Sequence, residues 1–329
     1  MTTTATMLSR RTALLGALGA TTALAAGALP AGPARAAAPM LGSLKPSVYR
    51  FTLGGFEVTT VNDGAIQLKG PHPIFGQNVD AEQVKELAAK HLLPMEQMII
   101  SFAPVLVNTG TELVLFDTGN GAGRRPKAGQ LRARLAAAGY TPEQVDIVVI
   151  THFHPDHIGG MLEDGEPAYP NARYVTSSTE YDFWSPVDKA SGPTERVGKL
   201  VQTNVVPFAE KFSFLKDGQD VVTGITGVAS FGHTPGHMAF HVESNGKRLI
   251  ISGDVANHYV VSLQHPEWHV RFDMDKEAAV QARKAVFGMI AAEKIPFIGY
   301  HMPFPNAGYV EPLGSGFRYI PASYQLDIG

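Results

Sequence analysis

The chain has 329 residues, of which 44% are hydrophobic and 17% charged, an ordinary composition for a globular protein. It carries 27 basic and 30 acidic residues, a net charge of −3, and has no basic run of the kind that binds nucleic acid. It contains no cysteine, which excludes disulfides, thiolate metal ligands and a cysteine nucleophile.

Residues 1–38 have the layout of an export signal. A pair of arginines precedes an apolar run rich in Ala, Leu and Gly, and small residues follow. This pattern is typical of a secretory signal peptide of the twin-arginine type, with cleavage near Ala36 or Ala38. An uncleaved membrane anchor is the alternative. We expect residues 39–329 to form one domain, exported to the periplasm or secreted, with no membrane contact after cleavage.

Hairpins and helices alternate in the first half of the mature chain. "YRFTLGGFEVTTVNDGAIQL" predicts two strands with a turn at Asn62–Gly64, and "PVLVNTGTELVLFDTGNGAG" predicts a hairpin that turns at Asn108–Gly110. Helical periodicity marks "DAEQVKELAAKHLL", with Asp80 as the N-cap, and "AGQLRARLAAAGY", which ends at Gly139. "QVDIVVI" is expected to be a short buried strand.

The second half predicts a similar mixture. "ARYVTSS" and "ITGVASFG" resemble strands, and "AFHVESNGKRLIISGD" predicts a hairpin that turns at Asn245–Gly246. "DMDKEAAVQARKAVFGMIAAEK" predicts the longest helix and "IPFIGYHM" a last strand, whereas residues 185–220 have weak periodicity and are expected to form a long excursion on the substrate side. Because strands come in hairpin groups with helices between the groups, we expect two sheets packed face to face with helices outside.

The segment "THFHPDH", residues 151–157, places three imidazoles and a carboxylate directly after the apolar run "VDIVVI". On extended backbone the side chains of His152 and His154 point the same way, so both can bind one metal ion, whereas Asp156 and His157 turn toward a second position. Imidazole and carboxylate ligands without thiolate suit Zn²⁺ or a similar ion. A lone histidine is usually structural, but this spacing favours a metal site.

Further candidate ligands lie where apolar strands break into turns that contain glycine. "SFGHTPGH" supplies His233 and His237, "LIISGD" supplies Asp254, and "IGYHM" supplies His301. These residues would give each of two metal ions three or four protein ligands, with positions left for water. The spacing alone leaves open whether they meet.

With this set of motifs the chain resembles the metallo-β-lactamase superfamily, whose mark is HxHxDH followed by a late His, Asp and His. The resemblance implies an α+β fold of the αββα sandwich type, with two divalent metal ions, expected to be Zn²⁺, at one edge of the paired sheets. It further implies two groups of ligands that share the bridging carboxylate of Asp254: His152, His154 and His233 in one group, and Asp156, His157 and His301 in the other.

The resemblance also implies residues that act around the metal ions. Asp117 of "LFDTG" would support the metal loop from behind, with a turn-capping aspartate as the alternative, and His237 would lie behind the ligands. Isolated aromatic residues are more often core than pocket. With that alternative open, four residues are candidates for the substrate pocket: Phe102, Trp184, Asn257 and His258.

Within the superfamily the chain is most similar to exported methyl parathion hydrolase-like proteins, through "LVNTGTELVLFDTG", "AAGYTPEQVD", "THFHPDHIGG", "EYDFW", "GHTPGH" and "GFRYIP". Related members include N-acyl homoserine lactonases. The bridging aspartate and the absence of cysteine argue against β-lactam hydrolysis. Asn257 stands where some lactonases carry a tyrosine over the substrate carbonyl, which weakens the assignment of a tyrosine electrophile.

The resemblance implies an enzyme in which a hydroxide held between two metal ions attacks the carbonyl of a lactone ester, and Asp156 or Asp254 protonates the leaving alkoxide. The first expectation is an N-acyl homoserine lactonase, which would silence bacterial quorum signals. The alternative is an organophosphorus triesterase that uses the same site, and a thioesterase or a non-hydrolytic metal protein ranks below both. The expected partner is a small-molecule substrate, without nucleic acid, and a homodimer is expected from relatives.

Overall fold

The computed structural model describes residues 38–323, and all the helices and strands described lie in the compact unit Lys45–Gly329. The predicted signal peptide falls almost entirely on residues 1–37, outside the described part of the chain. Among the described residues, none of the helices combines the length and the hydropathy that a membrane span requires.

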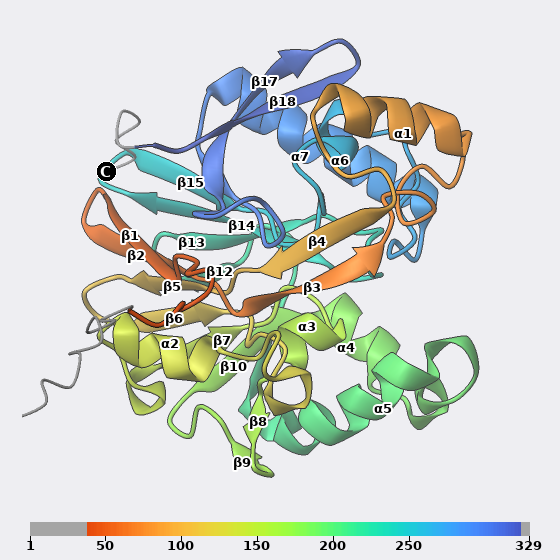
Figure 1. Ribbon diagram of the computed structural model, residues 1–329. Coiled ribbons are helices and arrows are strands. Elements are labelled where there is room, and N and C mark those ends of the chain that lie inside the picture. The colour runs from red at the N-terminus through yellow and green to blue at the C-terminus, as the bar shows by residue number, and fades with distance from the viewer. Residues whose placement is uncertain (1–37, 324–329) are drawn as a thin grey trace, which may run out of the picture. The chain divides into compact units, whose positions relative to one another are not determined.

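Two seven-stranded mixed sheets form the centre of this unit (Figure 1). The first sheet has the order β1-β2-β5-β6-β7-β10-β11, with bounds Val48–Leu53, Phe56–Val61, Val105–Asn108, Leu113–Phe116, Ile147–Val149, Arg173–Ser177 and Phe212–Leu215. The second sheet has its strands in sequence order from β12 to β18, with bounds Asp220–Val222, Ile225–Ala229, Met238–Ser244, Lys247–Ile251, Phe297–Ile298, Ala307–Leu313 and Gly316–Pro321.

The inner faces of the two sheets bury one hydrophobic core between them. Strand β14 shows why, since its sequence MAFHVES directs Met238, Phe240 and Val242 to one face by the two-residue period of a strand. Phe240 meets Phe116 of the first sheet with ring centroids 5.2 Å apart. Burial of this face on both sheets excludes water from the centre and fixes the sandwich.

Helices cover the outer faces of both sheets (Figure 1). On the first sheet, α2 (Leu131–Ala137), α4 (Ser178–Trp184) and α5 (Glu195–Asn204) pack their apolar residues against Leu115 and Val148. On the second sheet, α7 (Lys276–Glu293) packs Phe287 and Ile290 against Phe297. The result is the α+β, αββα sandwich that the sequence predicted.

A separate two-stranded sheet, β3 (Gly64–Lys69) with β4 (Gln97–Phe102), stands beside α1 (Ala81–Lys90), and its register pairs Ile66 with Ile100. Shorter elements complete the unit: β8 Leu162–Glu163, β9 Glu166–Pro167, α3 Pro155–Ile158, α6 Val261–Gln264, and the 3₁₀ turns Ala122–Arg124, Pro142–Gln144, Val187–Ala190, Gly192–Thr194 and Val206–Lys211.

The predicted turn at Asn62–Gly64 is wrong. The first hairpin turns at Gly54–Gly55, where Gly54 has φ +60°, and the chain leaves the first sheet at Asn62 to begin β3. Asp63 is buried there because its carboxylate accepts hydrogen bonds from the backbone N–H groups of Leu131 and Asn120, at 2.8 and 2.9 Å. Residues Asn62–Gly64 therefore anchor a loop and do not form a hairpin turn. The predicted turns at Asn108–Gly110 and Asn245–Gly246 are confirmed.

The excursion expected over residues 185–220 contains a helix that weak periodicity did not reveal. In α5 the apolar positions Val197, Leu200 and Val201 follow helical spacing, but the helix is only 10 residues long and carries Gly198 in its middle. Gly198 is required because a Cβ there would lie 2.0 Å from the carbonyl oxygen of Lys189. The helix is held by packing, with Val201 fully buried.

Candidate metal centre

The seven predicted ligands come from loops that follow strand ends of both sheets. His152 and His154 follow β7, and Asp156 and His157 lie in the short helix α3. From the second sheet, the loop between β13 and β14 carries His233, the loop after β15 carries Asp254 and the loop after β16 carries His301. Because β15 and β16 are parallel, the residues that follow them meet at one edge of the sheet.

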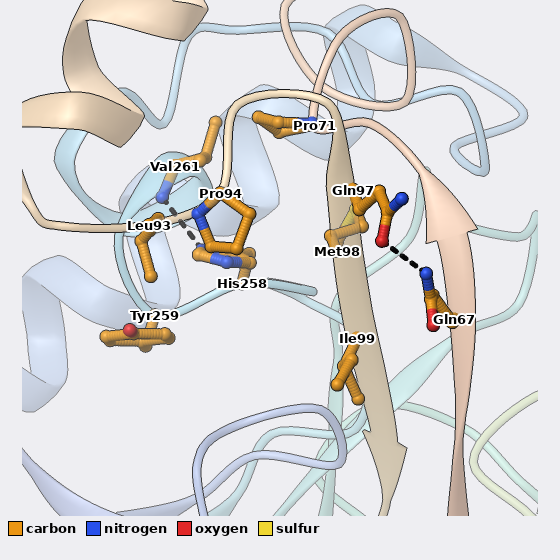
Figure 2. Close-up of a pocket in the computed structure, with 10 residues that line it drawn as sticks. All are labelled: Gln67, Pro71, Leu93, Pro94, Gln97, Met98, Ile99, His258, Tyr259 and Val261. Atoms are coloured by element: carbon orange, nitrogen blue, oxygen red, sulfur yellow. Dashed lines mark hydrogen bonds between the residues drawn. The ribbon is translucent and has the colours of Figure 1, made fainter.

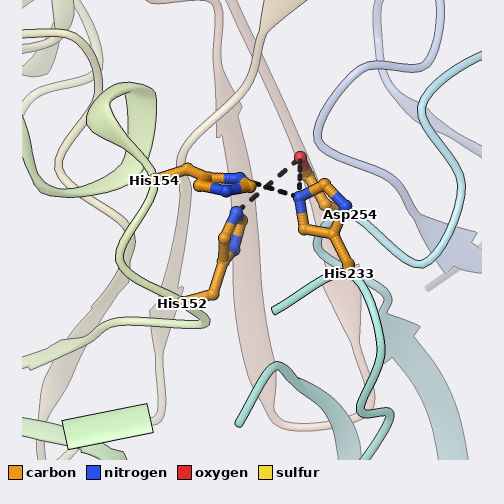
Figure 3. A group of neighbouring side chains, drawn as sticks. All are labelled: His152, His154, His233 and Asp254. Atoms are coloured by element: carbon orange, nitrogen blue, oxygen red, sulfur yellow. Dashed lines mark hydrogen bonds and ion pairs between the residues drawn. The ribbon is translucent and has the colours of Figure 1, made fainter. Parts of the chain in front are cut away.

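The first group consists of His152, His154, His233 and Asp254, whose ligand atoms all lie within 4.8 Å of one another. Figure 3 shows the four side chains pointing toward a common centre. His154 Nδ1 lies 2.9 Å from His233 Nε2, and Asp254 Oδ2 lies 3.2 Å from His233 Nε2 and 3.8 Å from His152 Nε2.

The second group consists of Asp156, His157, Asp254 and His301, again with ligand atoms within 4.8 Å. Asp156 Oδ2 lies 3.5 Å from His157 Nε2 and 3.6 Å from His301 Nε2. Asp254 belongs to both groups, with Oδ1 3.5 Å from His157 Nε2 and Oδ2 3.1 Å from His301 Nε2. The structure thus brings all seven predicted residues together in the predicted grouping.

Buried atoms without partners show that these groups fit divalent cations. Within the described residues, His152 Nε2, His157 Nε2 and Asp254 Oδ1 are buried and have no hydrogen-bond partner. Such atoms cost free energy unless something satisfies them, and all three face the two groups. Imidazole nitrogens and carboxylate oxygens at this density are the donor set of Zn²⁺ and similar ions.

Neighbouring carboxylates favour positive charge on two of the ligand imidazoles, whereas burial lowers the pKa of His152 and His154. Burial alone would lower the pKa of His157, but the carboxylates of Asp117, Asp254 and Asp156 raise it well above its ordinary value. Burial likewise opposes the charge on His233, yet hydrogen bonds to Asp254 and Asp273 raise its pKa to about 9. The carboxylates around these two imidazoles favour a positive charge there, which divalent cations would supply.

Three ligand imidazoles are oriented from behind by a bond from Nδ1 to a carboxylate or carbonyl oxygen, which leaves Nε2 facing the groups. His157 donates to Asp117 Oδ2 at 2.8 Å, His233 to Asp273 Oδ1 at 2.8 Å, and His301 to the carbonyl oxygen of Ser101 at 2.8 Å. Such partners fix the tautomer and the ring plane of a metal ligand.

Asp117 lies where the resemblance placed it, behind the loop of residues 151–157. Besides its bond to His157, its Oδ1 accepts from the backbone N–H of Thr151 at 2.8 Å. Burial raises the pKa of Asp117, although the charge of His157 works against this.

His237 lies outside both groups, beside Asp254. Its Nε2 accepts a hydrogen bond from the backbone N–H of Asp254 at 2.9 Å, and its Nδ1 donates to Ser230 Oγ at 2.8 Å. With both ring nitrogens engaged, His237 positions the loop that carries Asp254.

Sequence reasoning missed a buried ion pair behind His233. Asp273 Oδ2 accepts from Arg283 Nη2 at 2.8 Å, and the fully buried Arg283 also donates to the carbonyl oxygen of Val255 at 2.8 Å. The pair joins helix α7 to the loop that carries Asp254 and, through Asp273, to the loop that carries His233. Its only trace in the sequence is an arginine among the apolar positions of "VQARKAV", which no motif marks.

Sequence reasoning also assigned no role to Glu180, although it lies in the "EYDFW" segment. The side chain is fully buried and accepts from the backbone N–H groups of Phe153 and Gly236, at 2.8 and 2.9 Å, and from Thr234 Oγ1 at 2.7 Å. Burial raises its pKa, against these hydrogen bonds. Glu180 therefore ties the loop of His152 to the loop of His233.

A cavity of about 270 Å³ opens over the two groups. Residues of both groups form its floor, namely His154, Asp156, Asp254 and His301. Its walls are apolar side chains and three arginines: Ile66, Leu68, Ile100, Val197 and Phe272, with Arg124, Arg196 and Arg271.

The four residues predicted for the substrate pocket lie elsewhere. Trp184 is 2% exposed and packs in the core under the first sheet, because its large apolar ring fills the space between α4 and that sheet. Phe102 is buried and supports His301, with ring centroids 5.6 Å apart. Asn257 is buried too, and its Nδ2 donates to Asp254 Oδ2 at 3.0 Å.

His258 lines a different cavity, of about 320 Å³, shown in Figure 2. Its Nδ1 accepts from the backbone N–H of Val261 at 3.2 Å, which holds the ring beside the start of α6. Most of the other lining residues are apolar: Pro71, Leu93, Pro94, Met98, Ile99, Tyr259 and Val261, with Gln67 and Gln97. The expectation that His258 belongs to the pocket of the metal centre is therefore corrected.

Residues 104–291, more than half of the chain, match the family model of the metallo-beta-lactamase superfamily. The chain belongs to the metallo-beta-lactamase superfamily. The resemblance read from the HxHxDH motif is thereby confirmed.

Curated members of the superfamily share part of the sequence. The chain is 28% identical to N-acyl homoserine lactonase AttM of Agrobacterium fabrum over 130 residues, 37% of this chain and 46% of AttM. It is 24% identical to an N-acyl homoserine lactonase of Bacillus cereus over 168 residues, 50% of this chain and 60% of that protein. The alignment thus spans about half the length of these relatives.

Solved structures share the fold over nearly their whole length. AidC, a dizinc quorum-quenching lactonase, has a TM-score of 0.77 and 23% identity, and the match covers 84% of this chain and 98% of AidC. The hydrolase AbOPH, in the beta lactamase superfamily, has a TM-score of 0.79 and 27% identity, over 86% of this chain and 99% of AbOPH. At these identities the structures confirm the fold.

Proposed function

We propose that this protein is a metal-dependent hydrolase that opens a lactone ester, with N-acyl homoserine lactones as the first substrates to test. One observation carries the proposal: seven side chains meet in two groups that share Asp254 at the floor of a cavity. The relatives named N-acyl homoserine lactonases support the choice of substrate.

Each group would hold one divalent cation, and Zn²⁺ is the ion we propose, as in the dizinc enzyme AidC. Cations so held lower the pKa of water at the site from 15.7 to about 7 and polarise the carbonyl oxygen of a substrate. Asp254 would contact both cations, because its Oδ2 lies near His233 of the first group and its carboxylate also lies near His157 and His301 of the second.

Asp156 is the group we assign to proton transfer. Its side chain is 21% exposed and lines the cavity, whereas Asp254 is 4% exposed. An oxygen of Asp156 can take the proton of the attacking water and pass it to the leaving oxygen of the substrate. The apolar walls formed by Ile66, Leu68 and Val197 would hold an acyl chain and exclude bulk water.

A second candidate function is hydrolysis of an organophosphorus triester at the same site. Asn257 favours it, because the position expected for a tyrosine above a lactone carbonyl holds an amide that is turned toward Asp254. We also propose export by the signal at residues 1–38 and a homodimer.

A direct assay separates these functions. Purified, zinc-loaded protein is given N-hexanoyl homoserine lactone and methyl parathion in parallel, with Asp156→Asn as the variant. We expect ring opening of the lactone by the native protein and a loss of about 10²- to 10⁴-fold in kcat for the variant. Turnover of methyl parathion alone would favour the second candidate, and turnover of neither, with metal present, would overturn both.

A further inference from the structure

Positive charge gathers at the cavity over the candidate metal centre. Arg124, Arg196 and Arg271 all line it, and they come from three segments that lie far apart in the sequence. The chain as a whole has a net charge of −3, so the sign of the charge on these three side chains is opposite to that of the whole chain. The larger cavity in Figure 2 has no arginine or lysine among its described lining residues.

Among the described residues, none of the three guanidinium groups has an ion-pair or hydrogen-bond partner. The acidic residues nearest to them in the sequence are already paired with other cations. Glu195, beside Arg196, pairs with Lys199, and Asp273, two residues after Arg271, pairs with Arg283.

Glu163 is likewise already paired, since Arg125, the neighbour of Arg124, forms two bonds to it at 2.7 and 2.8 Å. Arg271 is held at the cavity wall, with its guanidinium carbon 5.2 Å from the ring centroid of Phe272. Guanidinium groups are forks that bind carboxylate or phosphate oxygens in pairs.

We propose that the three arginines form a subsite for an anionic group of the substrate, so that the protein prefers esters or lactones with a carboxylate to uncharged ones of the same size. This inference rests on the proposed hydrolase and deepens it. A neutral acyl lactone offers no partner for three guanidinium groups, whereas an apolar chain that ends in a carboxylate matches both the walls and the charges of the cavity.

Two chromogenic esters test the preference, because they differ only in a terminal group. Mono-4-nitrophenyl glutarate ends in a carboxylate where 4-nitrophenyl pentanoate ends in a methyl group. For the zinc-loaded native protein we expect kcat/KM to be about 10-fold higher for the glutarate, which corresponds to about 1.4 kcal/mol. The advantage should shrink as salt is added, since salt screens exposed charges.

The triple variant Arg124→Gln, Arg196→Gln, Arg271→Gln should lose this advantage, because KM for the glutarate should rise about 10-fold more than KM for the pentanoate. The matched control removes three cations away from the cavity, Lys85→Gln, Arg248→Gln, Arg318→Gln, and should keep the advantage. Equal kcat/KM for the two esters, or a preference that survives in the triple variant, would overturn the subsite.

A binding measurement separates this inference from the proposed function. The 4-nitroanilides of glutarate and of pentanoate are amides of the same shape, and calorimetry gives their affinities for the zinc-loaded protein without hydrolysis. Tighter binding of the charged anilide that is lost in the triple variant would support the subsite, even if neither ester is hydrolysed. Absence of ester hydrolysis would overturn only the proposed hydrolase. Equal affinities would overturn the subsite itself.

Discussion

Asp254 is fixed from several directions besides its place in both ligand groups. Its backbone N–H is bound by His237, and its Oδ2 accepts from Asn257 Nδ2 at 3.0 Å. Gly253 before it has φ +50°, and a Cβ there would lie 2.8 Å from His237 Nε2. The carboxylate is therefore held ready before any cation binds, so that binding requires little rearrangement.

Replacement of Asp254 by alanine tests whether it joins the two groups. We expect Asp254→Ala to retain at least one ion fewer per chain than the native protein, because both groups lose an oxygen ligand. Metal content by mass spectrometry after dialysis measures this, with the exposed Asp182→Ala as the control. Full retention of metal in Asp254→Ala would contradict the shared ligand.

Asp273 and Arg283 test the support behind His233. The pair is buried, so Asp273→Asn leaves the charge of Arg283 without its partner, which costs about 3–5 kcal/mol of unfolding free energy. Urea denaturation in the presence of a chelator measures this apart from metal loss. Glu293→Gln, which breaks the partly exposed pair with Arg248, should cost about 0–1 kcal/mol, and an equal loss in both variants would contradict the prediction.

At the scale of elements, the site is a set of loops joined by buried polar contacts. Glu180, at the start of α4, holds the loop after β7 and the loop before β14 through three hydrogen bonds. Gly236 allows this approach, since a Cβ there would lie 2.1 Å from the backbone nitrogen of Glu180. The relative position of His152 and His233 therefore depends on one carboxylate that binds neither of them.

Substitution of Glu180 by glutamine should separate the two loops. The amide puts a donor where the carboxylate accepted, so Glu180→Gln leaves buried donors of Phe153 or of Thr234 and Gly236 unsatisfied, at about 1–3 kcal/mol of unfolding free energy. Thermal denaturation of metal-free protein measures the loss, and zinc titration should show weaker binding. Exposed Glu86→Gln is the control, and a Glu180→Gln protein with native stability and zinc affinity would contradict this role.

At the scale of the whole compact unit, the candidate metal centre joins the two sheets. Four of the ligand residues follow β7 of the first sheet, and the other three follow β13, β15 and β16 of the second. Cations bound at this edge would connect the two halves of the sandwich. Metal binding should then stabilise the fold, because the ligands meet only in the folded state.

Removal of metal should lower the melting temperature. Excess zinc at about 1,000 times its dissociation constant adds about 4 kcal/mol of stability per site. For a domain of this size we expect chelation to lower Tm by about 10 °C or more. Calorimetry with zinc and with EDTA measures the shift, and Asp254→Ala should show a smaller one. An unchanged Tm on chelation would contradict a structural role for the metal.

The ligand residues were predictable from the sequence because metal chemistry constrains both residue type and spacing, as in residues 152–157. The supporting residues were not, since Glu180, Asp273 and Arg283 act through tertiary contacts that leave no local pattern. Trp184 illustrates the opposite error, because an aromatic side chain near a motif can fill the core instead of the pocket. The turn of the first hairpin was predicted at the wrong place because Asn, Asp and Gly at positions 62–64 are typical turn residues. In the structure the carboxylate of Asp63 instead anchors a loop.

The β3–β4 hairpin separates two cavities and contributes lining residues to both. Ile66, Leu68 and Ile100 face the cavity of the metal centre, whereas Gln67, Gln97 and Ile99 face the other cavity (Figure 2). Neighbouring positions along β3 therefore belong to different compartments, whereas on β4 Met98 lines the same cavity as Gln97 and Ile99, and only Ile100 faces the metal centre. Exchange of Ile66, Leu68 or Ile100 would change the walls of the chamber over the metal centre and leave the ligand residues of the sandwich in place.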